Sequence, residues 1–129
     1  MKTLDDVRSH RYINLETFRR SGAGVRTPVW FASAPAQDGD TRLYVYSVAN
    51  SGKAKRIRHT ESVRIAPCDM RGTVTGDWMN ARAALVTGKD FDRGMRLLNR
   101  KYWPWKSLLD LVSLLRPSAP RVMIEVRSV

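Results

Sequence analysis

The sequence is poor in the residues that form disulfides and metal sites. Among its 129 residues there is one cysteine, Cys68, and there are two histidines, His10 and His59. A single cysteine excludes an internal disulfide and a multi-cysteine metal site, and it suits a reducing cytoplasm. The histidines lack a metal-ligand spacing such as HExxH, so we expect neither a zinc hydrolase nor a structural metal site.

Long apolar runs are also absent. The best candidate, residues 108–115, is interrupted by Asp110 and Ser113 and is too short to span a membrane. The first ten residues, MKTLDDVRSH, have acids where a signal peptide needs an apolar core, so they indicate no export. We therefore expect a cytoplasmic protein.

The common catalytic motifs are missing as well. The sequence has no GxSxG, Walker A or GxGxxG motif, and no pair of carboxylates stands out. Cys68 falls in a predicted buried strand, where a lone cysteine is more often a small apolar side chain than a nucleophile. This pattern indicates that a cofactor supplies the chemistry while the protein binds and orients it, and no catalytic residue is assigned.

Acids are scarce relative to bases. Twenty-three Lys and Arg against twelve Asp and Glu give a net charge of +11, which favours a polyanionic or phosphorylated partner. One alternative is a nucleic-acid-binding β-barrel, in which four aromatic residues would stack on bases: Tyr44, Tyr46, Trp78 and Trp103. The bases are spread from Arg11 to Arg127 and no RNA-binding signature occurs, so nucleic acid is not the favoured partner.

The hydrophobic pattern predicts one domain over residues 1–129, mainly β within the α+β class. Alternation predicts six strands, at residues 11–18, 25–32, 42–47, 62–68, 78–86 and 121–127. Pro28 lies inside the second of these and implies an edge or a bulge, because proline cannot donate to a neighbouring strand. Helical spacing predicts helices at residues 4–7, 53–60, 90–102 and 105–115. The result is a mostly antiparallel β-barrel with flanking helices.

Residues 44–58 combine a strand, a Ser/Gly turn and a short basic helix. Such a turn leaves unpaired backbone N–H groups at the positive end of the helix dipole, where a phosphate binds well. Ser51 could add a hydroxyl donor and Lys53 a charge. The alternative is that Ser51 only caps the helix and the bases are solvated, which is the favoured interpretation for Lys55 and Arg58. For Ser51 and Lys53 both interpretations stay open.

Five segments together resemble one superfamily: TPVWFA (27–32), LYVYS (43–47), SGKAKRIR (51–58), VRIAPCDMRG (63–72) and ARAALVTG (81–88). The sequence is similar to the pyridoxamine 5′-phosphate oxidase-like superfamily, and within it to the branch of deazaflavin (F-420)-dependent oxidoreductases. The resemblance implies a six-stranded antiparallel split β-barrel of the FMN-binding type. It also implies a homodimer with deazaflavin F-420 or FMN in two interface clefts, and hydride transfer to or from a small organic substrate.

The resemblance places thirteen residues at the cofactor. Five from the second strand would line the cleft: Arg26, Thr27, Pro28, Val29 and Trp30. Four would hold the phosphate: Ser47, Ser51, Lys53 and Arg56. Pro67 and Cys68 would lie beside the ring system, and Asn80 and Arg82 would face the cleft or the partner subunit. Plain core packing is an open alternative for Trp30 and the favoured one for Phe31.

Three questions stay open at the level of the sequence. The phosphate residues do not discriminate FMN from F-420, although the positive charge suits the polyglutamate tail of F-420 somewhat better. A non-catalytic protein that carries a flavin-like or haem ligand is an alternative to an enzyme. The helix at 105–115 is apolar around most of its circumference, so it is expected to be buried in the core or a dimer interface rather than to lie on a membrane. Oxidation of pyridoxamine phosphate itself is not expected, because the substrate-phosphate residues of that enzyme have no counterpart here.

Overall fold

The structure, a computed structural model, describes residues 4–7, 9–35, 39–102 and 121–129. The predicted helix at 105–115 and Trp103 lie outside the described residues. Among those described, no helix has the length and apolar character that crossing a bilayer requires.

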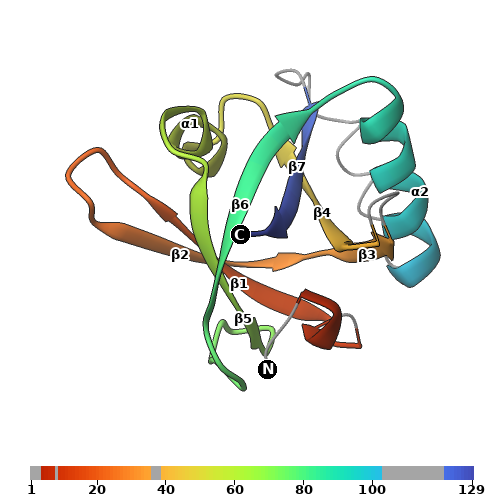
Figure 1. The fold of residues 1–129 in the computed structure, drawn as a ribbon, viewed down its shortest axis with the longest axis horizontal. Helices are drawn as coiled ribbons and strands as arrows, with labels where there is room; N and C mark the ends of the chain where they lie inside the picture. Colours follow the sequence, from red (N-terminus) through yellow and green to blue (C-terminus); the bar gives the residue numbers. More distant parts are fainter. Residues whose placement is uncertain (1–3, 8, 36–38, 103–120) are drawn as a thin grey trace.

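The chain forms one curled, antiparallel sheet, a half-barrel that is flanked by helices (Figure 1). Its strand order is β2-β1-β5-β6-β7-β4-β3. The strands are β1 (Tyr12–Phe18), β2 (Gly24–Trp30), β3 (Ala32–Pro35), β4 (Thr41–Val48), β5 (Ser62–Cys68), β6 (Met79–Val86) and β7 (Arg121–Ser128). The helices are the 3₁₀ turn η1 (Leu4–Val7), α1 (Gly52–His59) and α2 (Lys89–Tyr102). These elements confirm the predicted split-barrel class.

The prediction of six strands was wrong, because the structure has a seventh, β3. The single strand expected at 25–32 breaks at Phe31, whose backbone N–H and C=O both contact the Tyr102 hydroxyl, at 3.1 and 2.8 Å. After the break, β3 pairs with β4, with Ala32 opposite Tyr44. A four-residue segment of small residues has no recognisable alternation, so only its pairing with β4 identifies it as a strand.

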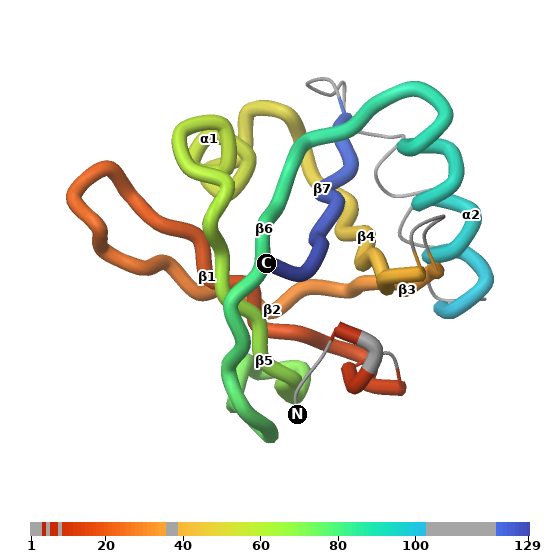
Figure 2. Tube along the Cα trace, in the orientation of Figure 1, coloured from red at the N-terminus to blue at the C-terminus, as the bar shows by residue number. Residues whose placement is uncertain are grey.

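The β1–β2 hairpin projects beyond the rest of the sheet, as the orange loop in Figures 1 and 2 shows. β2 is an edge strand, and Pro28 lies there opposite Asn14. An edge strand can accept a proline because one of its sides has no neighbour to receive an N–H. The edge interpretation of Pro28 is therefore confirmed.

The two faces of the sheet pack against different partners. On the inner face, a core closed by η1 and α1 contains the alternate residues of five strands: Ile13, Leu15, Leu43, Val45, Val63, Ile65, Ala81, Ala83, Ile124 and Val126. On the outer face, α2 covers β3, β4 and β7, and Leu98 and Tyr102 pack with Tyr44 and Met123. The rest of the outer face, over β5 and β6, is not covered by α2 (Figure 1).

Candidate functional site

The first feature of interest is the N-terminus of α1. Ser51 is its N-cap, and its hydroxyl accepts a hydrogen bond from Ala54 N–H at 3.2 Å. The first intrahelical bond runs from Lys55 N–H to the Ser51 carbonyl. The amides of Gly52 and Lys53 precede it and have no partner within the helix. Ser51 therefore caps the helix, and two backbone donors remain at the positive end of the helix.

The end of β4 contributes a buried hydroxyl to the same place. Ser47 is only 3% exposed, and its Oγ lies 2.9 Å from the Oγ of Ser51. One of the two hydroxyls donates to the other, so the pair connects the strand directly to the helix cap. The tight β4–α1 turn, in which Ser51 N–H donates to Val48 O, brings the two serines together.

Arg56 folds back over the first turn of α1. Its Nε donates to Thr17 Oγ1 on β1 at 2.6 Å, which anchors the guanidinium at the helix mouth. A Cβ built on Gly52 would lie 2.8 Å from Arg56 Nη1. The guanidinium therefore occupies the space beside the backbone that the glycine leaves free.

The electrostatics of this turn are strongly positive. Burial lowers the pKa of Lys53, and the nearby charge of Arg56 lowers it further. Burial also lowers the pKa of Arg56, with a further contribution from Arg19 on the β1–β2 loop. No acid lies in the first turn of α1. We call Ser47, Ser51, Gly52, Lys53 and Arg56 the α1 cradle: its hydroxyls, free amides and uncompensated cations suit a phosphate group.

The β2 residues divide between the two faces of the sheet. Val29 packs against the inner core, and Thr27 has the same alternation. The other three, Arg26, Pro28 and Trp30, alternate onto the outer face. Trp30 stacks on Tyr102 of α2, with ring centroids 4.8 Å apart and planes at 9°, and it packs with the outer core. These five residues therefore do not line one common cleft within a single chain.

Arg26 belongs to a charged cluster that the sequence did not reveal. Glu16 on β1 is buried, and it accepts from Arg26 Nε at 2.9 Å and from Arg64 Nη1 at 3.1 Å. Both guanidiniums lie over the ring of Trp78, at 4.6 and 4.8 Å from its centroid. We call Glu16, Arg26, Arg64 and Trp78 the Glu16 cluster. No sequence pattern marks this cluster. It depends on the strand register, in which Glu16 stands directly opposite both arginines.

Pro67 and Cys68 end β5, opposite Ile13 and Tyr12 of β1. Cys68 is a free, buried cysteine. Burial raises the pKa of its thiol, and the charge of Asp69 raises it further. This environment disfavours the thiolate, so Cys68 has none of the activation that a nucleophile needs.

Asn80 and Arg82 are exposed on the outer face of β6, where they stand opposite Arg64 and Ser62 of β5. They line a hollow of about 370 Å³, together with Phe18 and Arg64. None of the α1 cradle residues lines this hollow. The structure therefore places these two residues apart from the phosphate residues within one chain.

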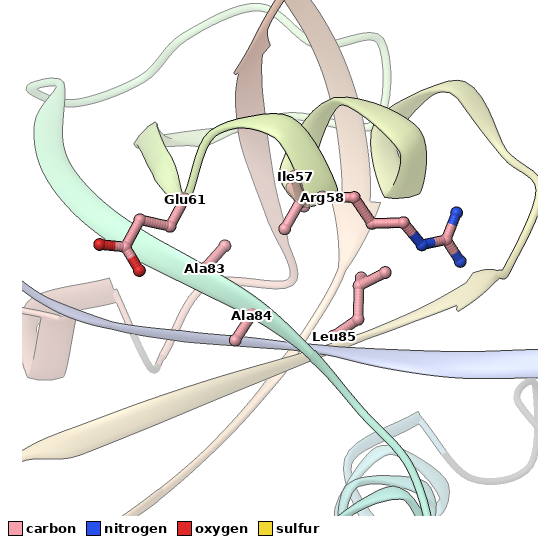
Figure 3. Close-up of a pocket in the computed structure, with 6 residues that line it drawn as sticks. All are labelled: Ile57, Arg58, Glu61, Ala83, Ala84 and Leu85. Carbon is pink, nitrogen blue, oxygen red and sulfur yellow. The ribbon is translucent and has the colours of Figure 1, made fainter.

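A second hollow, of about 520 Å³, lies between α1 and β6 (Figure 3). Its walls are the apolar side chains of Ile57, Ala83, Ala84 and Leu85, and the charged groups of Arg58 and Glu61 point away from one another. Its lining includes none of the thirteen predicted residues.

The histidines do not form a metal centre within the described part of the chain. His59, at the end of α1, lies 3.2 Å from an Arg20 nitrogen, and the His10 carbonyl accepts from Lys101 at 2.7 Å. No group of three or more His, Cys, Asp or Glu among the described residues could hold a metal ion.

Comparison with solved structures identifies the fold. A candidate pyridoxamine 5′-phosphate oxidase from Listeria innocua superposes with a TM-score of 0.61 at 15% identity, over 95% of this chain and 87% of its own. The chain has the split-barrel fold of the pyridoxamine 5′-phosphate oxidase-like proteins. An F420 reductase matches with a TM-score of 0.61 at 17% identity, over 100% of this chain and 95% of its own.

The same split-barrel fold also occurs in a haem protein. HutZ, the heme storage protein from Vibrio cholerae, matches with a TM-score of 0.66 at 11% identity, over 100% of this chain and 92% of its own. No family model and no curated protein matches the sequence. These similarities establish the split barrel, which hosts flavin-type and haem proteins alike, and leave the function to be argued from the site.

Proposed function

We propose that this chain is an oxidoreductase that binds deazaflavin F-420 or FMN through its phosphate at the α1 cradle. The observation that carries the proposal is the position of Arg56. Its guanidinium lies against Gly52 at a helix mouth that has two free amides and no acid in its first turn. Such a cluster of cations is costly without an anion, because each charge disfavours its neighbours.

When bound, either cofactor would supply hydride transfer to or from a small organic substrate. The chain's own contribution is then to bind the phosphate and orient the ring system. Ser47 and Ser51 offer hydroxyls, the amides of Gly52 and Lys53 offer N–H donors, and the side chains of Lys53 and Arg56 offer charge. Thr17 holds Arg56 in place through the 2.6 Å hydrogen bond.

No protein nucleophile is required in this proposal. Cys68 is the one thiol of the sequence, and its buried environment raises its pKa. Cys68→Ser should therefore retain most of the hydride-transfer activity. A loss of activity at unchanged cofactor affinity and unchanged melting temperature would indicate thiol chemistry and contradict the proposal.

A haem carrier is the second candidate, and the similarity to HutZ is what favours it. Haem needs an axial ligand, and the sequence offers only His10 and His59 as imidazoles. His59 is exposed and lies against a positively charged guanidinium. The charge of the α1 cradle suits a phosphate better than it suits an iron ligand, so we favour the flavin-type cofactor.

The assembly we propose is a two-fold homodimer in a reducing cytoplasm, with each cofactor touched by both chains. This arrangement would let the exposed residues Asn80 and Arg82 of one chain approach the other. Sedimentation at micromolar protein should give twice the chain mass with or without cofactor. A monomer that binds cofactor tightly would refute the shared cleft.

The test of the cofactor site compares two lysines of one helix. Lys53 is half-buried at the α1 cradle and Lys55, two residues on, is exposed. Lys53→Ala should weaken binding by roughly 1.5–3 kcal/mol, the range for hydrogen bonds to charged groups. Lys55→Ala should leave it almost unchanged.

Titration of tryptophan fluorescence with FMN and with F-420 gives both affinities and identifies the preferred cofactor. Haem is titrated in parallel and followed by its visible absorption. Equal, small effects of the two alanine variants would refute the α1 cradle as the phosphate site. Tight haem binding without flavin or F-420 binding would favour the carrier.

A further inference from the structure

The part of the outer face that α2 leaves open has a band of arginines. Arg26, Arg64, Arg82 and Arg127 come from β2, β5, β6 and β7. Arg82 stands directly opposite Arg127 in the β6–β7 register, and both are exposed. Like charges directly opposite each other destabilise a sheet. Among the described residues, Glu16 pairs with Arg26 and Arg64, and Glu61 pairs with Arg82.

The 370 Å³ hollow lies within this band. Its volume is in the range of pockets that hold small molecules. Two guanidiniums, those of Arg64 and Arg82, line it, Asn80 adds an amide, and Phe18 adds an aromatic wall. The hollow therefore combines donors for an oxyanion with a surface for an apolar group.

Arg64 is held rigidly at this position. Nη1 is engaged with Glu16 and the guanidinium plane lies over Trp78, so its orientation is set before any ligand arrives. A guanidinium has five N–H donors, and the Glu16 contact uses one. The side chain is 36% exposed, so donors remain accessible from the hollow.

Arg82 is held only weakly. It contacts Glu61 at 3.4 Å, with side chains 49% and 55% exposed. Exposed pairs of this kind contribute little to stability, so a ligand anion can compete for the guanidinium. Asn80 is also exposed, and its side chain forms no hydrogen bond with the described part of the chain.

We propose that this hollow is a second ligand site, in which Arg64 and Arg82 bind the carboxylate or phosphate group of a small organic anion and Phe18 packs against its apolar part. Within one chain the site is separate from the α1 cradle, because none of the cradle residues lines it. Bidentate recognition of a planar or tetrahedral oxyanion is the chemistry for which two guanidiniums are suited.

Calorimetric titration with three probes tests the site: phenylacetate, phenyl phosphate and the neutral amide phenylacetamide. We expect the anions to bind one per chain and phenylacetamide not to bind. Whichever anion binds more tightly identifies the preferred oxyanion. No anion binding up to about 10 mM, or equal binding of the amide, would overturn the proposal.

Two variants and one control locate the binding. Arg82→Gln removes an exposed charge and leaves the Glu16 cluster intact, and Arg64→Lys keeps the charge but removes the planar fork. Each should weaken anion binding by about tenfold or more, the effect of one charge-assisted hydrogen bond. Arg58→Gln alters the hollow between α1 and β6, and it should change the affinity for the anion less than about twofold. An equal loss in Arg58→Gln would show general charge attraction and refute the site.

Titration in the presence of saturating FMN separates this site from the proposed cofactor site. We expect the affinity for the anion to be unchanged. If FMN competes with the anion and this competition is lost in Arg82→Gln, the hollow belongs to the cofactor site. That result would overturn the inference and leave the proposed function standing.

Discussion

The guanidinium of Arg56 occupies the space that a side chain at Gly52 would need: Nη1 is 2.8 Å from the Cβ position of residue 52. Because Nε is bound to Thr17 at the same time, the guanidinium is confined between β1 and the first turn of α1. Residue 52 is therefore a glycine because Arg56 needs the space beside it. Its backbone conformation does not require glycine, since the glycines with positive φ are at other positions.

Gly52→Ala should therefore separate cofactor binding from folding. The added methyl group displaces the far end of a flexible side chain, and alanine favours a helix by up to about 1 kcal/mol over glycine. We expect the melting temperature to be unchanged or higher, and the affinity for FMN or F-420 to fall about tenfold. Fluorescence titration and thermal unfolding measure the two effects. Unchanged affinity would mean that Arg56 does not contact the phosphate.

Glu16→Gln should destabilise the fold, because it removes the charge that two arginines share. Breaking a buried ion pair costs about 3–5 kcal/mol, and the partial exposure of Arg26 and Arg64 reduces this to about 2 kcal/mol. The matched control is Glu61→Gln, which breaks an exposed pair and should cost less than about 1 kcal/mol. Urea unfolding of both variants provides the comparison, and equal losses would show that the Glu16 cluster adds no stability beyond a surface pair.

Tyr102→Phe tests the contact that ends β2. The hydroxyl accepts from Phe31 N–H at 3.1 Å and lies 2.5 Å from the Arg11 carbonyl. Its removal leaves a buried N–H without a partner and should cost about 1–3 kcal/mol, whereas the stacking on Trp30 is retained. Tyr12→Phe is the control, since its hydroxyl makes no hydrogen bond to any described residue. An equally large loss of stability in Tyr12→Phe would contradict this assignment.

The pH dependence of stability should report the titration of Lys101. Burial lowers the pKa of this lysine from 10.5 to about 8. Between these values the unfolded chain binds more protons than the folded one, so the free energy of unfolding should rise with pH above 8. Burial raises the pKa of Cys68 from 9.0, and that of Tyr102 from 10.0 to about 12, so both oppose the rise at higher pH.

The informative window therefore lies between pH 8 and 9. Urea unfolding in this window should show a positive slope that is smaller in Lys101→Gln; Lys53, whose pKa is also lowered by burial, adds to the slope in both proteins. An identical slope in the wild type and the variant would show that Lys101 titrates normally in the folded protein.

The local sequence determined most of the secondary structure and the turn that joins β4 to α1. Leu43 and Val45 alternate with Tyr44 and Tyr46, and the structure places the two pairs in the inner and outer cores. The Ser51 cap and the edge position of Pro28 were likewise predictable. Each depends on the conformational limits of one residue and its near neighbours, and these act before any tertiary contact forms.

Only the tertiary structure decided which side chains meet. Glu16 and Arg64 are 48 residues apart, and only the β1–β5 register makes them partners. Trp30 stacks on Tyr102 because α2 crosses the outer face at that point. Asn80 and Arg82 lie away from the α1 cradle because they alternate onto the outer face of β6, whereas α1 packs on the inner face. Periodicity reports which residues share a face of a strand, but the partners of that face come from segments distant in the chain. Their position depends on the packing of the whole sheet, which no local pattern encodes.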